Sequence, residues 1–226
     1  MAIDLVIFDL DGTLADTKLD LANAVNAARR KLRLPDLDNE VIYRYVGDGA
    51  RMLVRRALGP GFSEEDVDRA LEHFSRHYRD HLLDNTRLYP GVKESLERLK
   101  AHGVRMAVLT NKPVSFAEGV LQGLGVSDYF FRVLGGDSME EKKPDPAGVA
   151  LLPREAGVPA ERALLVGDSS VDVLTARNAG IAVCGVTYGL QPESLASEVP
   201  DILVERMEDL ADMVLADRGK KGAHEE

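Results

Sequence analysis

The stretch that decides the fold is Ile3-Asp4-Leu5-Val6-Ile7-Phe8-Asp9-Leu10-Asp11-Gly12-Thr13-Leu14. Residues 3–8 form a short, β-rich apolar run that ends at Asp9. If the strand continues, alternation places Asp9 and Asp11 on the same side, and Gly12 permits a sharp turn after them. Two carboxylates this close repel each other unless a cation or a proton joins them. The stretch therefore predicts a strand that delivers an acidic pair to a cation.

Similar apolar runs recur along the chain at 104–109, 163–166 and 182–187, with weaker ones at 132–135 and 201–204. They are short and bounded by polar or glycine residues, which is typical of strands buried on both faces. Segments with helical periodicity, at 91–102, 114–124 and 171–179, lie between several of them. This alternation predicts an α/β fold with a Rossmann-like parallel sheet. Within it, Pro153 is expected to kink or split the helical segment from Ala147 to Gly157.

The stretch from 15 to 85 has a different character. It contains no convincing strand, and helical patterns occupy about 17–33, 38–46, 50–58 and 63–83. We expect residues 15–85 to form an all-helical cap domain, inserted into an α/β core domain built from residues 1–14 and 86–226. Linkers near Ala15–Lys18 and Asp84–Pro90 would then act as hinges.

Polar residues follow two more of the predicted strands, because Thr110 ends one run and Asp168 ends another. A single aspartate or threonine at such a position is most often a cap or a turn residue. In an open parallel sheet, however, ligands bind beyond the carboxyl ends of the strands. The joint occurrence of Asp9, Thr110 and Asp168 at three strand ends therefore predicts a binding site there. A hard divalent cation with oxygen ligands fits the carboxylates, and Mg²⁺ is favoured when phosphate is present.

With these motifs the sequence resembles the haloacid dehalogenase superfamily, whose first motif is Asp-x-Asp-Gly-Thr/Val. The second motif resembles Thr110-Asn111-Lys112, and the third resembles Lys142-Lys143-Pro144-Asp145-Pro146, where Lys143 matches the family lysine. The fourth resembles Gly167-Asp168-Ser169-Ser170-Val171-Asp172. All four lie in the family's order across nearly the whole chain.

The resemblance implies a role for each of these residues. Asp9 would be the nucleophile that forms an aspartyl-phosphate, and Asp11 the general acid and base. The carboxylates of Asp9 and Asp168, with the backbone carbonyl of Asp11, would ligate Mg²⁺. Asp172 would contact the metal directly or through a neighbour, although it could also be an ordinary first-turn carboxylate of a helix. The phosphoryl group would be held by Thr110, Asn111 and Lys143. Dehalogenases of the superfamily lack the second aspartate, so Asp11 favours phosphoryl transfer.

The helical insert would be the family's mobile cap, which contacts the leaving group. Its segment Val46-Gly47-Asp48-Gly49-Ala50-Arg51-Met52-Leu53-Val54 resembles a segment of the phosphoglycolate phosphatases. We expect Gly47 and Gly49 to allow close approach to a small ligand, and Arg51 to meet the carboxylate of 2-phosphoglycolate. The alternative for Arg51 is a surface position on a cap helix.

The resemblance implies a Mg²⁺-dependent phosphomonoester hydrolase that converts 2-phosphoglycolate to glycolate and phosphate. Three other functions stay open at this stage. One is a phosphatase for another small metabolite, such as a sugar phosphate or pyrophosphate. Another is a mutase resembling β-phosphoglucomutase, which must return the phosphoryl group to the sugar before water takes it. The third is a regulatory protein that kept the fold, which is disfavoured because all the motif residues are present.

Composition limits the partners and the compartment. The chain has 226 residues, 28 Lys+Arg and 38 Asp+Glu, for a net charge of -10, which disfavours nucleic acid and anionic membranes. No apolar run approaches the ~20 residues of a membrane span. The single cysteine, Cys184, suits a reducing compartment, and the first residues do not resemble a secretory signal. We expect a cytoplasmic enzyme, monomeric or homodimeric, that acts on a small phosphorylated metabolite.

Overall fold

A six-stranded parallel sheet forms the centre of the protein in a computed structural model, which describes residues 2–219. The strand order is β5-β4-β1-β6-β7-β8, so β1 lies between β4 and β6. The strands are β1 (Leu5–Phe8), β4 (Arg105–Leu109), β5 (Arg132–Leu134), β6 (Ala163–Gly167), β7 (Ala182–Val186) and β8 (Ile202–Val204). The predicted parallel α/β sheet is confirmed, including both of its weaker strands.

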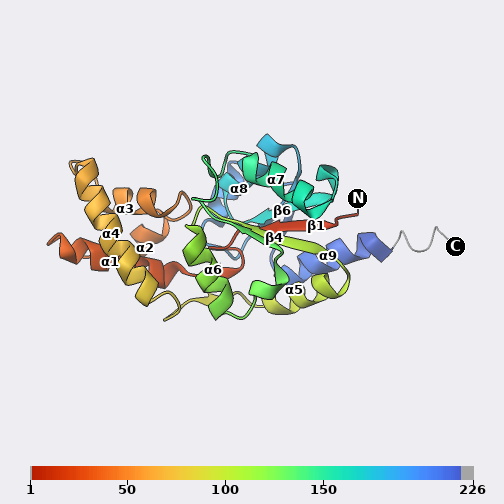
Figure 1. The fold of residues 1–226 in the computed structure, drawn as a ribbon, viewed down its shortest axis with the longest axis horizontal. Coiled ribbons are helices and arrows are strands. Elements are labelled where there is room, and N and C mark those ends of the chain that lie inside the picture. The colour runs from red at the N-terminus through yellow and green to blue at the C-terminus, as the bar shows by residue number, and fades with distance from the viewer. Residues whose placement is uncertain (1, 220–226) are drawn as a thin grey trace.

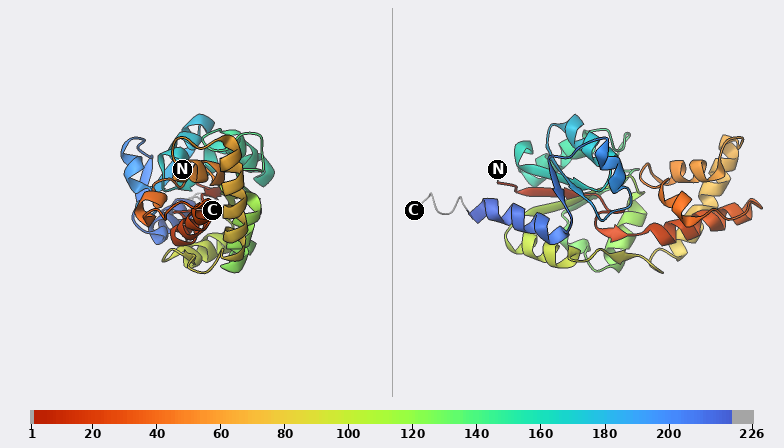
Figure 2. Two further views of the ribbon diagram at one scale, coloured as in Figure 1. Left: turned by 90° about the vertical axis from the view of Figure 1, so that its left-hand side faces the viewer. Right: turned by 180° about the vertical axis from the view of Figure 1, so that it is seen from behind.

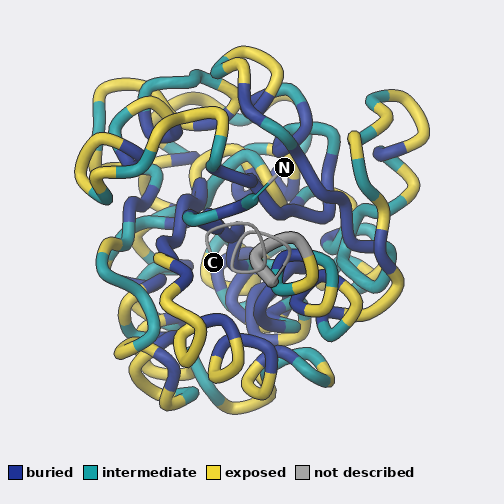
Figure 3. The backbone as a smooth tube through the Cα atoms, turned by 90° about the vertical axis from the view of Figure 1, so that its right-hand side faces the viewer, coloured by how far each residue is buried: buried dark blue, intermediate teal, exposed yellow. Residues whose placement is uncertain are grey.

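Helices cover both faces of this sheet (Figure 1). They are α5 (Val92–Ala101), α6 (Val114–Gly123), α7 (Ala147–Ala156), α8 (Ser170–Ala179) and α9 (Met207–Gly219). Alternate residues of β1 point to opposite faces. Val6 and Phe8 pack in the cluster that holds α5, α6 and α9, and Leu5 and Ile7 in the cluster that holds α7 and α8. Figure 3 shows the resulting pattern, with buried backbone inside and exposed backbone at the periphery.

Four helices form an insert between β1 and β4, at one end of the molecule (Figures 1 and 2). They are α1 (Lys18–Lys31), α2 (Asn39–Tyr43), α3 (Ala50–Leu58) and α4 (Glu64–Asp80), and we call them the helical insert. Helix α4 begins at Ser63, whose side chain forms a capping box with Asp66. The insert has its own apolar core, and Phe116 of α6 belongs to that core too. The insert is therefore packed against the α/β sheet domain through α6.

The two chain segments that connect the insert pair with each other. Strand β2 (Ala15–Asp16) and strand β3 (Arg87–Leu88) form an antiparallel ladder of two residues each. We expected no strand between residues 15 and 85, and β2 corrects this. A two-residue strand is too short to leave a periodic pattern, and its partner lies far along the sequence.

Pro153 does not split its helix. We expected a kink or a break between Ala147 and Gly157, but α7 runs continuously through the proline. Proline removes one backbone donor from the helix. Burial of Val149, Leu152 and Pro153 itself offsets that loss.

Within residues 2–219, every helix is too short or too polar to cross a lipid bilayer.

Candidate active site

The sheet topology brings three sequence-predicted residues together. Strands β4, β1 and β6 are neighbours, so their carboxyl ends place Thr110, Asp9 and Asp168 at one edge. From β1 the chain runs to β4 and β5 on one side, and then returns to β6, β7 and β8 on the other. A point where the strand order reverses in this way forms a crevice at the carboxyl end of a parallel sheet. A pocket of about 650 Å³, including its open mouth, lies there. Its walls come from both the sheet domain and the helical insert.

Three carboxylates cluster at the base of this pocket. Asp9, Asp168 and Asp172 each offer an oxygen atom, and these atoms lie within 4.8 Å of one another. Burial raises the pKa of Asp9 to about 6, although Lys143 lowers it. Burial, together with the negative charges of Asp172 and Asp9, raises the pKa of Asp168 to about 8. The cluster is therefore short of positive charge.

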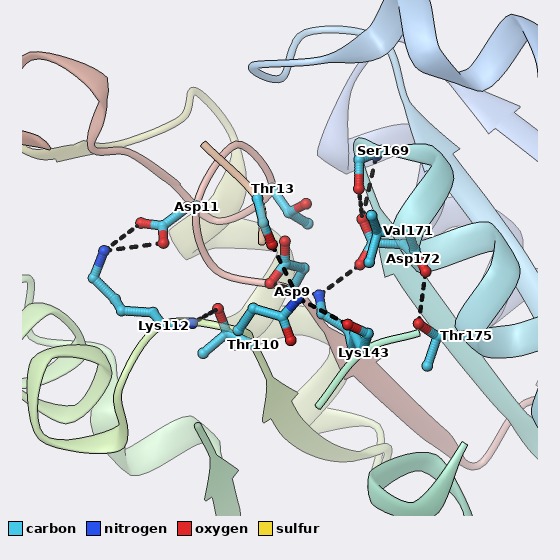
Figure 4. A network of polar contacts seen from close by, with 12 residues as sticks. Asp9, Asp11, Thr13, Thr110, Lys112, Lys143, Ser169, Val171, Asp172 and Thr175 are labelled. Carbon is cyan, nitrogen blue, oxygen red and sulfur yellow. Dashed lines mark hydrogen bonds and ion pairs between the residues drawn. The ribbon is translucent and has the colours of Figure 1, made fainter. Parts of the chain in front are cut away.

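Lys143 is the one cation in direct contact with this cluster among the described residues (Figure 4). Its Nζ lies 2.6 Å from Asp172 Oδ1 and 2.9 Å from Asp9 Oδ1. Burial disfavours its charge, but Asp172 and Asp9 outweigh burial, so the pKa of Lys143 is raised. The other oxygen of Asp172 accepts hydrogen bonds from the backbone and hydroxyl of Ser169, which begins helix α8. Asp172 thus orients the lysine beside Asp9.

Asp168 is fixed by two loops. Its Oδ2 accepts backbone hydrogen bonds from Leu190, at 2.6 Å, and from Gln191, at 3.1 Å. On the other side it lies against Gly12, whose φ is +89° and where a Cβ atom would stand 2.2 Å from Oδ2. Only glycine fits there, because the conformation and the space both exclude a side chain.

The acidic cluster fits a divalent metal ion. Asp9 Oδ1 is buried and accepts no well-aligned hydrogen bond, even though it lies near Lys143. Lys143 is shared between Asp9 and Asp172, so one ammonium faces three buried carboxylates, and buried charge that is not fully paired is costly. Three hard oxygen donors close together are the ligand type that Mg²⁺ and Ca²⁺ prefer. Asp9, Asp168 and Asp172 could therefore hold such an ion.

The carboxylate of Asp11 lies apart from this cluster. Figure 4 shows it turned toward Lys112, whose Nζ is 2.7 Å from Oδ1 and 2.9 Å from Oδ2. The Thr17 hydroxyl also donates to Oδ1, at 2.6 Å. Asp11 still lines the same pocket as Asp9. Its side chain is therefore in the pocket but outside the carboxylate cluster of Asp9, Asp168 and Asp172.

Thr110 and Asn111 lie side by side in the pocket wall. The Thr110 hydroxyl accepts a hydrogen bond from the backbone of Lys112, at 3.2 Å. The Asn111 amide donates to the carbonyl of Lys143 and to the carbonyl of Gly47, both at 3.0 Å. Asn111 therefore connects the backbone at Lys143 with the backbone at Gly47 of the insert.

The structure brings the two insert glycines to the pocket but not Arg51. Gly47 and Gly49 are among the lining residues. Arg51 is not, and its half-exposed side chain pairs with Glu64, at 2.7 Å, and with Asp68. The reason is the helix face: Leu53 is buried in the core of the insert, and Arg51, two positions earlier, lies on the outer side. This placement gives no support to the expected contact between Arg51 and a substrate carboxylate.

Sequence reasoning gave no role to three pocket residues. Lys112 was quoted within a motif, but its pairing with Asp11 was not foreseen. Tyr78 of α4 is stacked with Phe74. Gln191 donates to the carbonyl of Val46 in the insert. A lysine directly after a predicted site residue was a usable signal, whereas Tyr78 and Gln191 offered none.

Taken together, the fold and the site define an α/β enzyme. Its carboxylate cluster, which can bind a cation, lies at the switch point of a parallel sheet, and the helical insert forms part of the pocket wall. Comparison with known proteins agrees. The family model for haloacid dehalogenase-like hydrolases matches residues 6–186. The chain therefore belongs to the haloacid dehalogenase-like hydrolases.

Relatives cover nearly the whole chain. Phosphoglycolate phosphatase 1 of Pseudomonas aeruginosa is 41% identical over 213 residues, which is 91% of this chain and 78% of the relative. Phosphoglycolate phosphatase of Vibrio vulnificus is 41% identical over 220 residues, which is 94% of this chain and 96% of the relative. The crystal structure of a predicted phosphoglycolate phosphatase from Haemophilus somnus superposes with a TM-score of 0.88, at 35% identity, and covers 93% of this chain and 97% of that one.

Proposed function

We propose that this protein is a Mg²⁺-dependent phosphatase that hydrolyses 2-phosphoglycolate to glycolate and phosphate. The observation that carries the proposal is the buried cluster of Asp9, Asp168 and Asp172, which has Lys143 as the one cation in direct contact with it among the described residues. Family membership supports the reaction class, and the names of the relatives support the substrate.

In the first half of the reaction, an Asp9 oxygen attacks phosphorus and the bond from phosphorus to the glycolate oxygen breaks. Asp11, which is protonated at the start of this step, gives its proton to that departing oxygen, and an aspartyl-phosphate remains on Asp9. Bound Mg²⁺ would supply positive charge to the carboxylates and to the phosphoryl oxygens. Lys143 keeps Asp9 in place and adds a fixed charge beside it, at 2.9 Å.

In the second half, the Asp11 carboxylate takes a proton from water as the water oxygen attacks phosphorus. The bond between phosphorus and Asp9 breaks, which releases phosphate and restores both aspartates. Thr110 and Asn111 both line the pocket next to Asp9. The Thr110 hydroxyl would donate a hydrogen bond to a phosphoryl oxygen. Asn111 would donate from its backbone N–H, because its amide already donates to two backbone carbonyls. Such chemistry depends on positioning and charge neutralisation more than on reactive groups.

The helical insert would serve as a cap over this centre. We propose core boundaries at 1–14 and 86–226, and cap boundaries at 15–85. The insert contributes Gly47, Gly49, Phe74 and Tyr78 to the pocket walls. It would thereby limit the size of the leaving group and exclude water during phosphoryl transfer.

The test is phosphate release with Mg²⁺ from phosphoglycolate, several sugar phosphates, pyrophosphate and nucleoside monophosphates. Asp9→Asn serves as the blank. We expect phosphoglycolate to lead by at least about tenfold in kcat/KM, which corresponds to about 1.4 kcal/mol. If another phosphate leads, the substrate assignment is wrong although the reaction class stands. If no substrate is hydrolysed above the blank, the phosphatase proposal fails.

A further inference from the structure

Two lysines supply the positive charge among the described residues of the pocket wall, and they occupy different positions. Lys143 is held between Asp9 and Asp172 at the base. Lys112 is almost fully buried and, within residues 2–219, pairs with Asp11 alone, at 2.7 Å.

Lys112 also contacts the helical insert. Its Nζ lies 4.8 Å from the ring centre of Tyr78, over the face of the ring. Tyr78 belongs to α4, whereas Lys112 follows β4, so the contact joins the two parts of the molecule. Asp11, Lys112 and Tyr78 therefore form a row along the pocket wall from the centre of the reaction to the insert.

Apart from its approach to Lys112, the Tyr78 hydroxyl has no hydrogen-bond partner among the described residues, although only 1% of the residue is exposed. Burial raises the pKa of Tyr78 to about 12, so the phenol keeps its proton. The ring is fixed on two sides, by stacking on Phe74 and by an edge contact with Phe116 of α6. A buried hydroxyl without a partner costs about 1–3 kcal/mol, and a ligand in the pocket would remove that cost.

We propose that Lys112 and Tyr78 form the subsite for the carboxylate of the leaving group, in which the ammonium pairs with the carboxylate and the phenol donates a hydrogen bond to it. This rests on the proposed function and adds to it the residues that select the substrate. When phosphoglycolate binds, the substrate carboxylate takes a place beside Asp11 on the lysine. The substrate carboxylate thus binds Lys112 together with the Asp11 carboxylate or in its place, at a position where the protein already holds a carboxylate.

The position of Lys112 fits the shape of phosphoglycolate. Asp11 is proposed to act on the oxygen between phosphorus and glycolate, and one methylene carbon separates that oxygen from the carboxyl carbon. A group that touches Asp11 is therefore next to the place where the carboxylate lies. A neutral alkyl phosphate leaves the charge of Lys112 and the hydroxyl of Tyr78 unused, so it gains no binding free energy from them.

The experiment compares two substrates that differ only at this end. Phosphoglycolate carries the carboxylate, and ethyl phosphate carries a methyl group in its place. The readout is the ratio of their kcat/KM values, because any effect on the phosphoryl chemistry cancels in this ratio. Lys112→Met removes the charge, and Tyr78→Phe removes only the hydroxyl. Arg51→Met is the matched control, a cation of the insert that does not line the pocket.

We expect Lys112→Met to lower the ratio at least about tenfold, mainly through a higher KM for phosphoglycolate, and Lys112→Arg to restore part of it. Tyr78→Phe is expected to lower the ratio about threefold with little loss in Tm, since it deletes a hydroxyl that makes no well-aligned hydrogen bond among the described residues. Because Tyr78→Phe should not unfold the protein, it tests the subsite even if Lys112→Met is unstable. Arg51→Met is expected to leave the ratio within about twofold.

Four results would overturn the subsite. If Lys112→Met lowers kcat/KM equally for both substrates, Lys112 only positions Asp11. If Tyr78→Phe leaves the ratio unchanged, or if Arg51→Met lowers it, the carboxylate binds elsewhere. If the wild-type protein hydrolyses phosphoglycolate and ethyl phosphate equally well, the protein does not select substrates by the carboxylate, although it is still a phosphatase. Failure of the wild-type protein to hydrolyse either substrate would instead count against the proposed function.

Discussion

The carboxylate of Asp20 accepts hydrogen bonds from both the backbone N–H and the hydroxyl of Thr86, each at 2.8 Å. Asp20 lies in the first turn of α1, and Thr86 lies just before β3, so the contact joins the two segments that connect the insert. Asn85 adds two more donors to the same carboxylate, from its backbone and from its amide. Asp20 thus holds the base of the insert together.

Replacing this carboxylate should destabilise the protein. Asp20 is buried, and Asp20→Asn replaces the charged carboxylate with a neutral amide. The N–H groups of Asn85 and Thr86 and the Thr86 hydroxyl then lose a charged acceptor. We expect a loss of about 2–3 kcal/mol, or about 5–10 °C in Tm, in thermal unfolding at pH 7. Asp36→Asn, which removes an exposed ion pair with Arg30, is the control and should leave Tm nearly unchanged.

The same contact has a predictable pH dependence. Burial acts to raise the pKa of Asp20, but the hydrogen bonds from Asn85 and Thr86 outweigh it, so the pKa is lowered. A carboxyl whose pKa is lower in the folded state stabilises the fold at pH values above its pKa in the unfolded state. This contribution is lost as the pH falls through the pKa of the folded state. The difference in Tm between wild type and Asp20→Asn should therefore shrink in acid. A difference that stays constant below about pH 4 would contradict this.

Lys143 should be indispensable, and its neighbour Lys142 should not. Lys143→Met removes the charge beside Asp9 and Asp172, so phosphate release should fall at least about a hundredfold. Lys142 is exposed and donates to the Asp48 carbonyl, at 2.6 Å. Lys142→Met should therefore keep more than about a tenth of the wild-type rate. The measurement is kcat with saturating Mg²⁺, and equal losses in the two variants would contradict the assignment.

The residues that follow the strands were predictable because their positions depend on local sequence. An apolar run that ends in Asp9, Thr110 or Asp168 fixes where each side chain stands, and a parallel sheet then brings the ends together. Contacts between the sheet domain and the insert were not predictable in this way. The pairing of Lys112 with Asp11 and its approach to Tyr78 join three distant segments, and no periodic pattern connects them.

Arg51 shows a different limit. Its charge suggested a ligand contact, but helical geometry already argued against it, because Arg51 and Arg55 share one face while Leu53 is buried. Both arginines pair with Glu64 at the start of α4. The helical periodicity of α3 therefore indicated that the Arg51 side chain points away from the core of the insert. The expectation of a ligand contact came from the motif resemblance instead.

Binding of Mg²⁺ should weaken in acid. A metal requires its carboxylates without protons, and burial raises the pKa of Asp9 to about 6 and that of Asp168 to about 8. Without metal, the raised values also mean that stability declines as the pH rises from about 4 toward 8, because the folded state holds the protons more tightly.

Thermal unfolding with Mg²⁺ or with a chelator measures this effect. With saturating Mg²⁺ we expect Tm to rise by about 5–10 °C at about pH 8.5 and by much less at about pH 5.5. Asp168→Asn should abolish most of the rise, whereas Asp128→Asn, an exposed aspartate outside the pocket, should not. A rise that is equal at both pH values would show that these carboxylates are not the ligands.

Gly12 should tolerate no side chain, for a reason that differs from ordinary backbone strain. In Gly12→Ala the new methyl group would meet Asp168 Oδ2 at 2.2 Å and displace the carboxylate from the cluster. Gly59 has a similar φ of +83°, but nothing lies within 4 Å of the position that its Cβ would take. Gly59→Ala is therefore the matched control, because it introduces the strain without the collision. We expect both variants to lose about 1–3 kcal/mol of stability, and only Gly12→Ala to lose phosphate release and the Mg²⁺-induced rise in Tm. If Gly12→Ala keeps both, Asp168 does not need its present position, and the metal site described above is wrong.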